Sequence, residues 1–166
     1  MTRLPSNTPV FGAAPSDVAC HLRLAAYGVI LDTQGRVAAV RGPAGYWLPG
    51  GGMLADETPE ATVVREVREE LGRSIQQVRR IGEAVQFFHA TDEGRWYEMI
   101  ATFFQAEFAE TGLGGEHELV WLQVEEESAF FHACHAWAVS RVRPRVARNS
   151  QAKIGLTISP CTSVRR

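Results

Sequence analysis

Residues 49–73 read PGGGMLADETPEATVVREVREELGR, and this stretch decides the fold of the chain. Its opening, Pro49 to Gly52, is not expected to continue a strand and favours a loop whose backbone approaches a ligand closely. The following residues predict a helix, because Thr58 suits the N-cap, Pro59 suits the first helical position and Gly72 suits a left-handed end. The stretch therefore predicts a glycine-rich loop that runs into a helix.

The predicted helix carries a stripe of carboxylates. A helix turns about 100° per residue, so Glu66, Glu69 and Glu70 fall within roughly 100° of arc on one face. A neighbouring arc is apolar and is expected to face the core; it holds Val64, Val67 and Leu71. Carboxylates crowded in this way repel one another and weaken an isolated helix. A hard divalent cation is the natural partner for such a stripe.

A solvated acidic helix is the alternative interpretation of the stripe. Its carboxylates would then be satisfied by neighbouring arginines, namely Arg65, Arg68 and Arg73. Under that interpretation the glycine-rich entry, the separate Glu57 and the adjacent Arg65–Glu66 pair would all be coincidences. The metal-binding interpretation is therefore favoured.

These residues resemble the signature of the Nudix (MutT-like) hydrolases, Gly-x5-Glu-x7-Arg-Glu-U-x-Glu-Glu-x-Gly-U, in which U is a bulky aliphatic residue. The matching positions are Gly51, Glu57, Arg65, Glu66, Val67, Glu69, Glu70 and Gly72. The last U position departs from the pattern, because Arg73 stands where the helix end should pack onto the sheet, and Ile75 is expected to fill that space. The resemblance implies an α/β Nudix fold, in which a mixed sheet lies between helices as an α/β/α sandwich.

The resemblance also implies a reaction, the hydrolysis of a pyrophosphate linkage in a nucleoside diphosphate joined to another moiety. The implied cofactor is Mg²⁺, with Mn²⁺ as the alternative ion. Its ligands, which are also the implied catalytic residues, would be the carboxylates of Glu66, Glu69 and Glu70, joined by the backbone carbonyl of Gly50. Mg²⁺ needs few protein oxygens, because it keeps several waters and shares the phosphates of its substrate.

Further residues receive supporting roles from the resemblance. Glu57 would pair with Arg65 and fix the loop against the helix. A general base often lies in the loop before a late strand, where this chain carries Glu116 and Glu118. Glu116 is preferred because it precedes the strand. Both residues also suit an ordinary acidic surface, and a glutamate of the signature remains the alternative base.

Candidate substrate contacts lie next to the signature. Arg41 follows a strand that should end near the cleft, where it would meet a phosphate or simply be solvated. Gly51 allows close approach, and Trp47 and Phe88 suit stacking on a base, with core packing as the alternative. The markers of dinucleoside polyphosphate and ADP-ribose hydrolases, a Tyr and a Pro, are absent from residues 88–91. A nucleoside triphosphate, including an oxidised one, is therefore slightly favoured as substrate.

Charge bears on two other functions. Residues 1–140 hold ten arginines and all nineteen acids, a net charge of −9, whereas residues 141–166 hold seven positive charges and no acid. The acidic body argues against nucleic acid as a general partner. The basic end leaves an RNA 5′-end pyrophosphohydrolase as an alternative. A non-catalytic Nudix-like ligand sensor is the other, although such proteins normally lose one or more of the glutamates present here.

The rest of the chain predicts one Nudix domain at residues 20–142, an irregular lead-in at 1–19 and a basic extension at 143–166. Expected strands are 21–32, its hairpin partner 36–41, then 75–88, 95–108 and 119–124, and a helix is expected over 126–142 with His132 and His135 on it.

No long apolar run suggests a membrane span or a secretory signal. Three widely spaced cysteines favour a reducing compartment. We therefore expect a cytoplasmic enzyme, monomeric or homodimeric, that acts on a small nucleotide.

Overall fold

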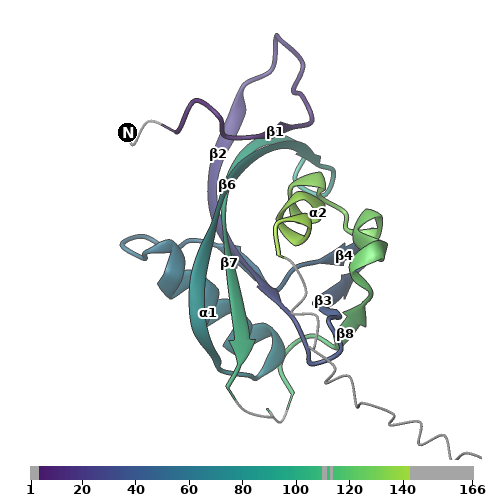
Figure 1. Ribbon diagram of the computed structural model, residues 1–166. Coiled ribbons are helices and arrows are strands. Elements are labelled where there is room, and N and C mark those ends of the chain that lie inside the picture. Colours follow the sequence, from purple (N-terminus) through teal and green to yellow (C-terminus); the bar gives the residue numbers. More distant parts are fainter. Residues whose placement is uncertain (1–3, 110–111, 113, 143–166) are drawn as a thin grey trace, which may run out of the picture.

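The fold is built from two sheets with helices on opposite sides (Figure 1). The computed structural model describes residues 4–109, 112 and 114–142, so the predicted basic extension lies outside the described residues. The elements, in chain order, are β1 Val10–Phe11, β2 Cys20–Ile30, β3 Val37–Gly42, β4 Gly45–Trp47, β5 Gly50–Gly52, α1 Pro59–Leu71, β6 Ile75–Ala90, β7 Arg95–Phe108, β8 Leu119–Leu122, the 3-10 helix η1 Val124–Ala129 and α2 Ala133–Ser140. None of the helices in the described part is long and apolar enough to cross a membrane.

The larger sheet is mixed. Its strand order is β1-β6-β7-β2-β5, with β2 parallel to β7, and β6 antiparallel to β7. The smaller sheet, β4-β3-β8, is antiparallel throughout. Strands β6 and β7, both expected from the sequence, form a long hairpin through the turn at residues 91–94.

Two apolar clusters fill the space between the layers. Alternate residues of β2 point to opposite faces, so Ala26 and Ile30 pack with Val63 and Val67 of α1. The other face of β2 packs in a second cluster that includes Cys134, Ala138 and Val139 of α2. The molecule is therefore an α/β/α sandwich, as predicted.

Local signals place helix α1 correctly. Thr58 Oγ1 accepts the N–H of Ala61 at 3.2 Å, and Gly72 ends the helix with φ of 63°. The predicted core face is wrong at one residue, since Val64 is 41% exposed and Val63 is fully buried instead. Val63 fills the space above Gly28, where a side-chain Cβ would lie 3.3 Å from it.

The glycines at 50–52 form strand β5, which corrects the predicted loop. They pair with Ala25 to Tyr27 of β2 in antiparallel register. A Cβ atom at Gly50 would lie 2.2 Å from the carbonyl oxygen of Ala26. Glycine therefore permits this pairing by letting two backbones come close, which a local reading of turn residues does not reveal.

The predicted hairpin of residues 21–32 and 36–41 is also wrong as a pairing. Strands β2 and β3 belong to different sheets and are joined by a single bridge between Leu31 and Val37. Val37 to Val40 are buried on both faces, because β3 lies inside the sandwich and pairs with β4 and β8 instead.

The predicted helix over 126–142 is broken in two. Phe130 is extended, with φ of −70° and ψ of 133°, and forms a bridge with Tyr46 between η1 and α2. Its side chain is 7% exposed, so burial of this aromatic ring competes with helix continuation. The lead-in is likewise not wholly irregular, since β1 pairs in parallel with β6.

Arg73 occupies the position at which the Nudix signature has a bulky aliphatic residue, and the structure accommodates it there. The Arg73 guanidinium lies 5.0 Å from the centre of the Phe108 ring. Ile75 packs against the apolar cluster that contains Leu71, which is the position expected of it.

Candidate functional site

A cleft of about 430 Å³ lies where α1 and β5 meet the ends of β3 and β6. It is lined by Glu70, by Gly50 and Gly51, and by all of the other residues expected to contact substrate, which are Arg41, Trp47 and Phe88. The fold thus brings together residues from five separate elements, α1, β3, β4, β5 and β6. Of the signature glutamates, only Glu70 lines this cleft among the described residues.

Glu70 is held at the wall of the cleft by the glycine strand. Its Oε2 accepts the backbone N–H of Gly50 at 2.9 Å. Burial raises the pKa of Glu70 to about 7, and the nearby charges of Glu66, Glu116 and Glu69 act in the same direction. The N–H of Gly50 opposes this rise. The side chain therefore exchanges its proton near neutral pH.

Glu66 and Glu69 share one guanidinium. Arg65 Nη1 lies 2.9 Å from an oxygen of each carboxylate. Glu66 also packs against β5 so closely that a Cβ at Gly51 would lie 2.8 Å from its carboxyl carbon. The absence of a side chain at Gly51 therefore leaves the room that this carboxylate uses.

Arg65 also ties the preceding loop to the helix. Its Nε donates to Glu57 at 2.6 Å, and its Nη2 donates to Glu57 at 3.0 Å and to the carbonyl of Gly52 at 3.2 Å. Glu57 accepts further hydrogen bonds from Leu54 N–H and the Thr62 hydroxyl. The Arg65 guanidinium, together with these donors, lowers the pKa of Glu57 to about 2.

The carboxylate oxygens of the signature suit a hard divalent ion, but in this structure they point to different partners. Within residues 4–109, 112 and 114–142, no three acidic, His or Cys side chains are gathered closely enough to hold a metal. Glu66 and Glu69 instead bind Arg65. The carboxylates are nevertheless neighbours on one face, and Glu69 is about half exposed at 51%. Glu66, Glu69 and Glu70 supply carboxylate oxygens from one helix, which is the donor type that hard divalent ions take, so the donor set fits such an ion.

The loop with the candidate base is attached to the end of α1. The backbone N–H of Glu116 donates to Glu69 O at 3.1 Å, and that of His117 donates to Glu70 O at 2.8 Å. Glu116 is exposed, yet its charge contributes to the raised pKa of Glu70. His117, which the sequence did not single out, lines the cleft.

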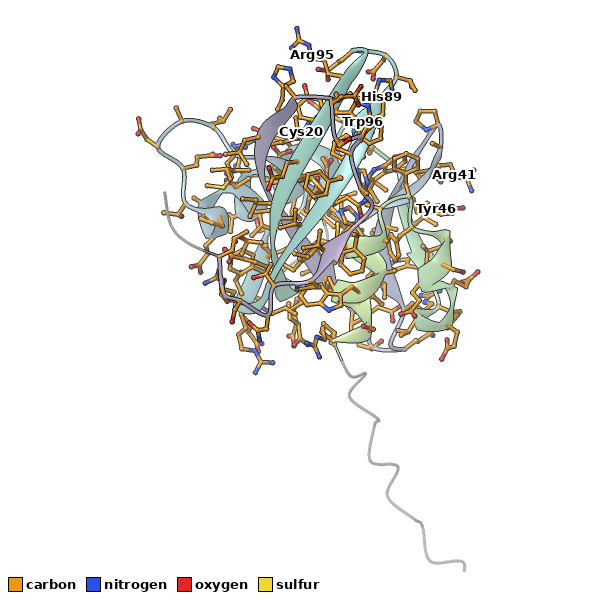
Figure 2. The ribbon with its side chains drawn as sticks, turned by 90° about the horizontal axis from the view of Figure 1, so that it is seen from above. Cys20, Arg41, Tyr46, His89, Arg95 and Trp96 are labelled. Atoms are coloured by element: carbon orange, nitrogen blue, oxygen red, sulfur yellow. The ribbon has the colours of Figure 1, made fainter. Side chains whose placement is uncertain are left out.

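The candidate substrate contacts form the mouth and walls of the cleft. Arg41 donates to the hydroxyl of Tyr46 at 3.0 Å, and the two side chains lie together at one edge of the molecule (Figure 2). The Trp47 ring lies 5.1 Å from that of Phe131. Phe88 contacts the ring of His132 at 4.7 Å. The cleft therefore combines an exposed cation with aromatic walls.

His132 and His135 are buried, and neither lies on a solvated helix face. His132 lines the cleft, and burial lowers its pKa to about 4 with help from the charge of Arg23. His135 Nδ1 accepts the N–H of Leu48 at 3.1 Å, which places the ring proton on Nε2. Among the described residues that buried Nε2 has no hydrogen-bond partner. Helical spacing alone gave no signal for this burial.

Stability should fall as the pH drops from about 6.5 toward 4, because His132 stays neutral in the fold while the unfolded chain binds a proton. The folded-state pKa of about 4 lies below the ordinary value of 6.5. The stability that depends on the neutral His132 ring is therefore complete above about pH 6.5 and declines as the pH falls toward 4. His132→Phe keeps a ring and removes the titration, which should reduce the decline by up to about 3 kcal/mol.

Urea unfolding at neutral pH and near pH 5 measures this difference. The matched control is His21→Phe, at an exposed position of β2, which should follow the wild type. An equal decline in wild type and His132→Phe would contradict the expectation.

Comparison with known proteins agrees with this geometry. The chain matches the NUDIX domain model over residues 21–142. A prenyl-diphosphate phosphatase of Methanosarcina mazei is 27% identical over 118 residues, which cover 64% of this chain and 66% of that protein. A MutT-like protein of Streptomyces ambofaciens is 51% identical over 47 residues, 27% of this chain and 30% of the relative. The chain thus spans just under two thirds of the first relative and less than a third of the second.

Solved structures share the fold. The crystal structure of a MutT Nudix hydrolase from Burkholderia pseudomallei superposes with a TM-score of 0.59, covering 74% of this chain and 99% of that one at 23% identity. Identity at this level shows the architecture and not the substrate. The domain match, however, extends over most of the described residues and includes the entire signature from Gly51 to Gly72. The chain therefore belongs to the Nudix family.

Proposed function

We propose that this chain is a divalent-metal-dependent pyrophosphohydrolase. Its substrate would be a nucleoside diphosphate joined to another moiety, with a slight preference for a nucleoside triphosphate, including an oxidised one. The observation that carries the proposal is the packing of Glu66 and Glu70 of α1 against the glycine strand, with Glu70 at the wall of a cleft that also holds an exposed cation and aromatic rings.

The metal would be held by Glu66, Glu69 and Glu70 and by the carbonyl of Gly50. When bound, Mg²⁺ or Mn²⁺ supplies charge neutralisation, which a phosphoanhydride needs because its own negative charge repels nucleophiles. Burial and the charges of nearby carboxylates raise the pKa of Glu70, and the repulsion among these carboxylates supports this assignment, since a cation would relieve it.

The protein's own groups would position the reaction. The N–H of Gly50 orients the Glu70 carboxylate, and the pair of Arg65 with Glu57 fixes the loop beside it. Arg41 would meet a phosphate at the mouth, while Trp47 and Phe88 would contact the attached group. Glu116 would accept the proton of the attacking water, because its loop is bonded to the end of α1.

Glu116→Gln should lower the rate at neutral pH by about 10²-fold or more, with a smaller effect on substrate binding, if Glu116 is the base. The loss should shrink at higher pH, because hydroxide then becomes available without a base. Glu118→Gln is the matched control and should be milder. Rate–pH profiles of both variants provide the measurement. Equally small effects would return the role to a signature glutamate, and a larger effect of Glu118→Gln would reverse the assignment.

A substrate panel tests the proposed function most directly. It contains a nucleoside triphosphate, an oxidised counterpart, ADP-ribose, a prenyl diphosphate and an RNA with a 5′-triphosphate, each with Mg²⁺ or Mn²⁺. Prenyl diphosphate is included because the Methanosarcina relative carries that name. Cleavage of the pyrophosphate linkage of a nucleotide would support the proposal, read as released phosphate or pyrophosphate from a triphosphate and as AMP with ribose 5-phosphate from ADP-ribose. Binding of a nucleotide without hydrolysis of any panel member would favour the ligand sensor, and hydrolysis confined to RNA would favour the RNA enzyme.

A further inference from the structure

The cleft contains a second arginine that the proposed function does not use. Arg23 lies on β2 beside Met99 of β7. Both residues line the cleft, as does Tyr27 further along the same strand. Arg23 is half-buried, whereas Arg41 at the mouth is exposed. The inner part of the cleft therefore has a cation of its own.

The Arg23 guanidinium lies along the glycine strand. A Cβ atom at Gly52 would lie 3.6 Å from Arg23 Nη2 and 3.8 Å from its Nε. Gly50, two residues earlier on that strand, donates to Glu70. The glycine strand β5 therefore lies next to the proposed metal-binding carboxylates at Gly50 and next to the Arg23 guanidinium at Gly52.

Arg23 differs from the other arginines of the site in having no partner among the described residues. Arg65 binds three carboxylates and Arg41 binds a hydroxyl, whereas no side-chain hydrogen bond or ion pair in the described part engages the guanidinium of Arg23. Its charge acts on neighbours that are neutral, Tyr27 and His132. A half-buried cation without a counter-charge costs free energy that an anionic ligand would recover.

We propose that Arg23 binds a non-bridging phosphate oxygen of the substrate from the β2 side of the cleft, and that it selects for a diphosphate at this position. The proposal rests on the proposed function. The planar fork of donors in a guanidinium matches phosphate oxygens in pairs. Because the phosphate would be held before and during reaction alike, Arg23 acts on binding more than on the chemical step.

The first test measures binding without turnover. Inorganic pyrophosphate is titrated, in the presence of Mg²⁺, into the wild type, Arg23→Met, Arg23→Lys and the control Arg79→Met, which changes an exposed arginine of β6. Loss of a charge-assisted hydrogen bond should weaken binding by about 10- to 100-fold in Arg23→Met. Arg23→Lys should recover part of the affinity, and Arg79→Met should bind as the wild type does.

The second test separates a binding role from a structural one. With the best substrate of the panel, Arg23→Met should raise KM by a factor similar to the loss of pyrophosphate affinity, while kcat changes less than about threefold. Its melting temperature should equal or exceed that of the wild type, because an unpaired half-buried charge is removed. Folding of each variant is checked by circular dichroism.

The outcomes keep the two proposals apart. Unchanged pyrophosphate affinity and KM in Arg23→Met, with a working wild-type hydrolase, would overturn the role of Arg23 alone. A lower melting temperature and a lower kcat with no recovery in Arg23→Lys would show a structural role and also overturn it. Arg23-dependent pyrophosphate binding by a protein that hydrolyses nothing in the panel would support Arg23 as a phosphate contact and refute the proposed hydrolase.

Discussion

Glu70→Gln should lower turnover by about 10²- to 10⁴-fold, the range expected when a group that holds a proton or a metal at the reacting centre is neutralised. Glu70 is the signature glutamate that faces the cleft, and Gly50 fixes its orientation. Glutamine preserves the shape and an oxygen that accepts the same N–H, but it carries no charge. Glu69→Gln should also reduce turnover strongly. Steady-state kinetics at saturating Mg²⁺ measures both losses.

Stability provides the control for this substitution. Burial and three nearby carboxylates disfavour the charged form of Glu70, so the metal-free variant should melt at the same temperature as the wild type or higher. Glu60→Gln, at an exposed position in the first turn of α1, should leave turnover unchanged. Near-normal turnover of Glu70→Gln under saturating Mg²⁺ would refute the assignment of Glu70.

Arg65→Met should reduce activity by about 10- to 100-fold, as expected when a residue that orients metal ligands is lost. Arg65 contacts Glu57, Glu66 and Glu69 through its guanidinium. Without it, the loop loses the contacts that Arg65 makes with Glu57 and Gly52, and the carboxylates repel one another, so the melting temperature should also fall. Arg68→Met changes an exposed arginine of the same helix and should have little effect on either quantity.

The pH dependence of unfolding gives a separate measurement of the Arg65 contact. The pKa of Glu57 is held at about 2 against an ordinary value of 4.5. The stability that this provides is complete above about 4.5 and is lost as the pH falls through the folded-state pKa near 2. In Arg65→Met most of that contribution should be lost, because only the Leu54 N–H and the Thr62 hydroxyl remain as donors to Glu57, so acid unfolding should begin at a higher pH. Acid unfolding curves identical to the wild type would contradict a structural role for the pair.

Helix α1 was predictable because its ends are encoded locally. Thr58, Pro59 and Gly72 act within a few residues of their positions in the chain, and each takes the predicted place. The carboxylate spacing is likewise a property of one helix. The side-chain face was misassigned at Val64 because the buried face depends on what the helix packs against, and Gly28 of a distant strand supplies that space for Val63.

The pairings that the sequence did not reveal are all long-range. Strand β5 exists because Gly50 to Gly52 lie against β2, more than twenty residues earlier in the chain. Strands β2 and β3 separate because β3 finds partners in β4 and β8. The break between η1 and α2 follows from the bridge of Phe130 to Tyr46. Local propensity contains none of these contacts, so a local interpretation gave a loop, a hairpin and a continuous helix.

The candidate site was predictable to the same extent. The signature residues and four candidate substrate contacts could be named, because motif spacing and strand ends are visible in the sequence, although their roles stay proposals. Arg23, His117 and His132 were not identified as cleft residues. Each belongs to a segment that is distant from the signature in the sequence and is brought to the cleft by long-range packing. An arginine among the mostly apolar residues of β2 was the available signal for Arg23.

The backbone hydrogen bonds between the last turn of α1 and residues 116 and 117 have a consequence for how such a protein can vary. Because the N–H groups of Glu116 and His117 are bonded to the carbonyls of Glu69 and Glu70, the position of this loop is set by the helix and not by the length of the connection leading to it. Gly112 packs against Gly72 at the end of the helix, so we expect insertions or deletions between Ala109 and Gly112 to leave these two bonds in place. The chain can therefore change the length of that connection, and with it the surface around the cleft, while the candidate site residues keep their relative positions.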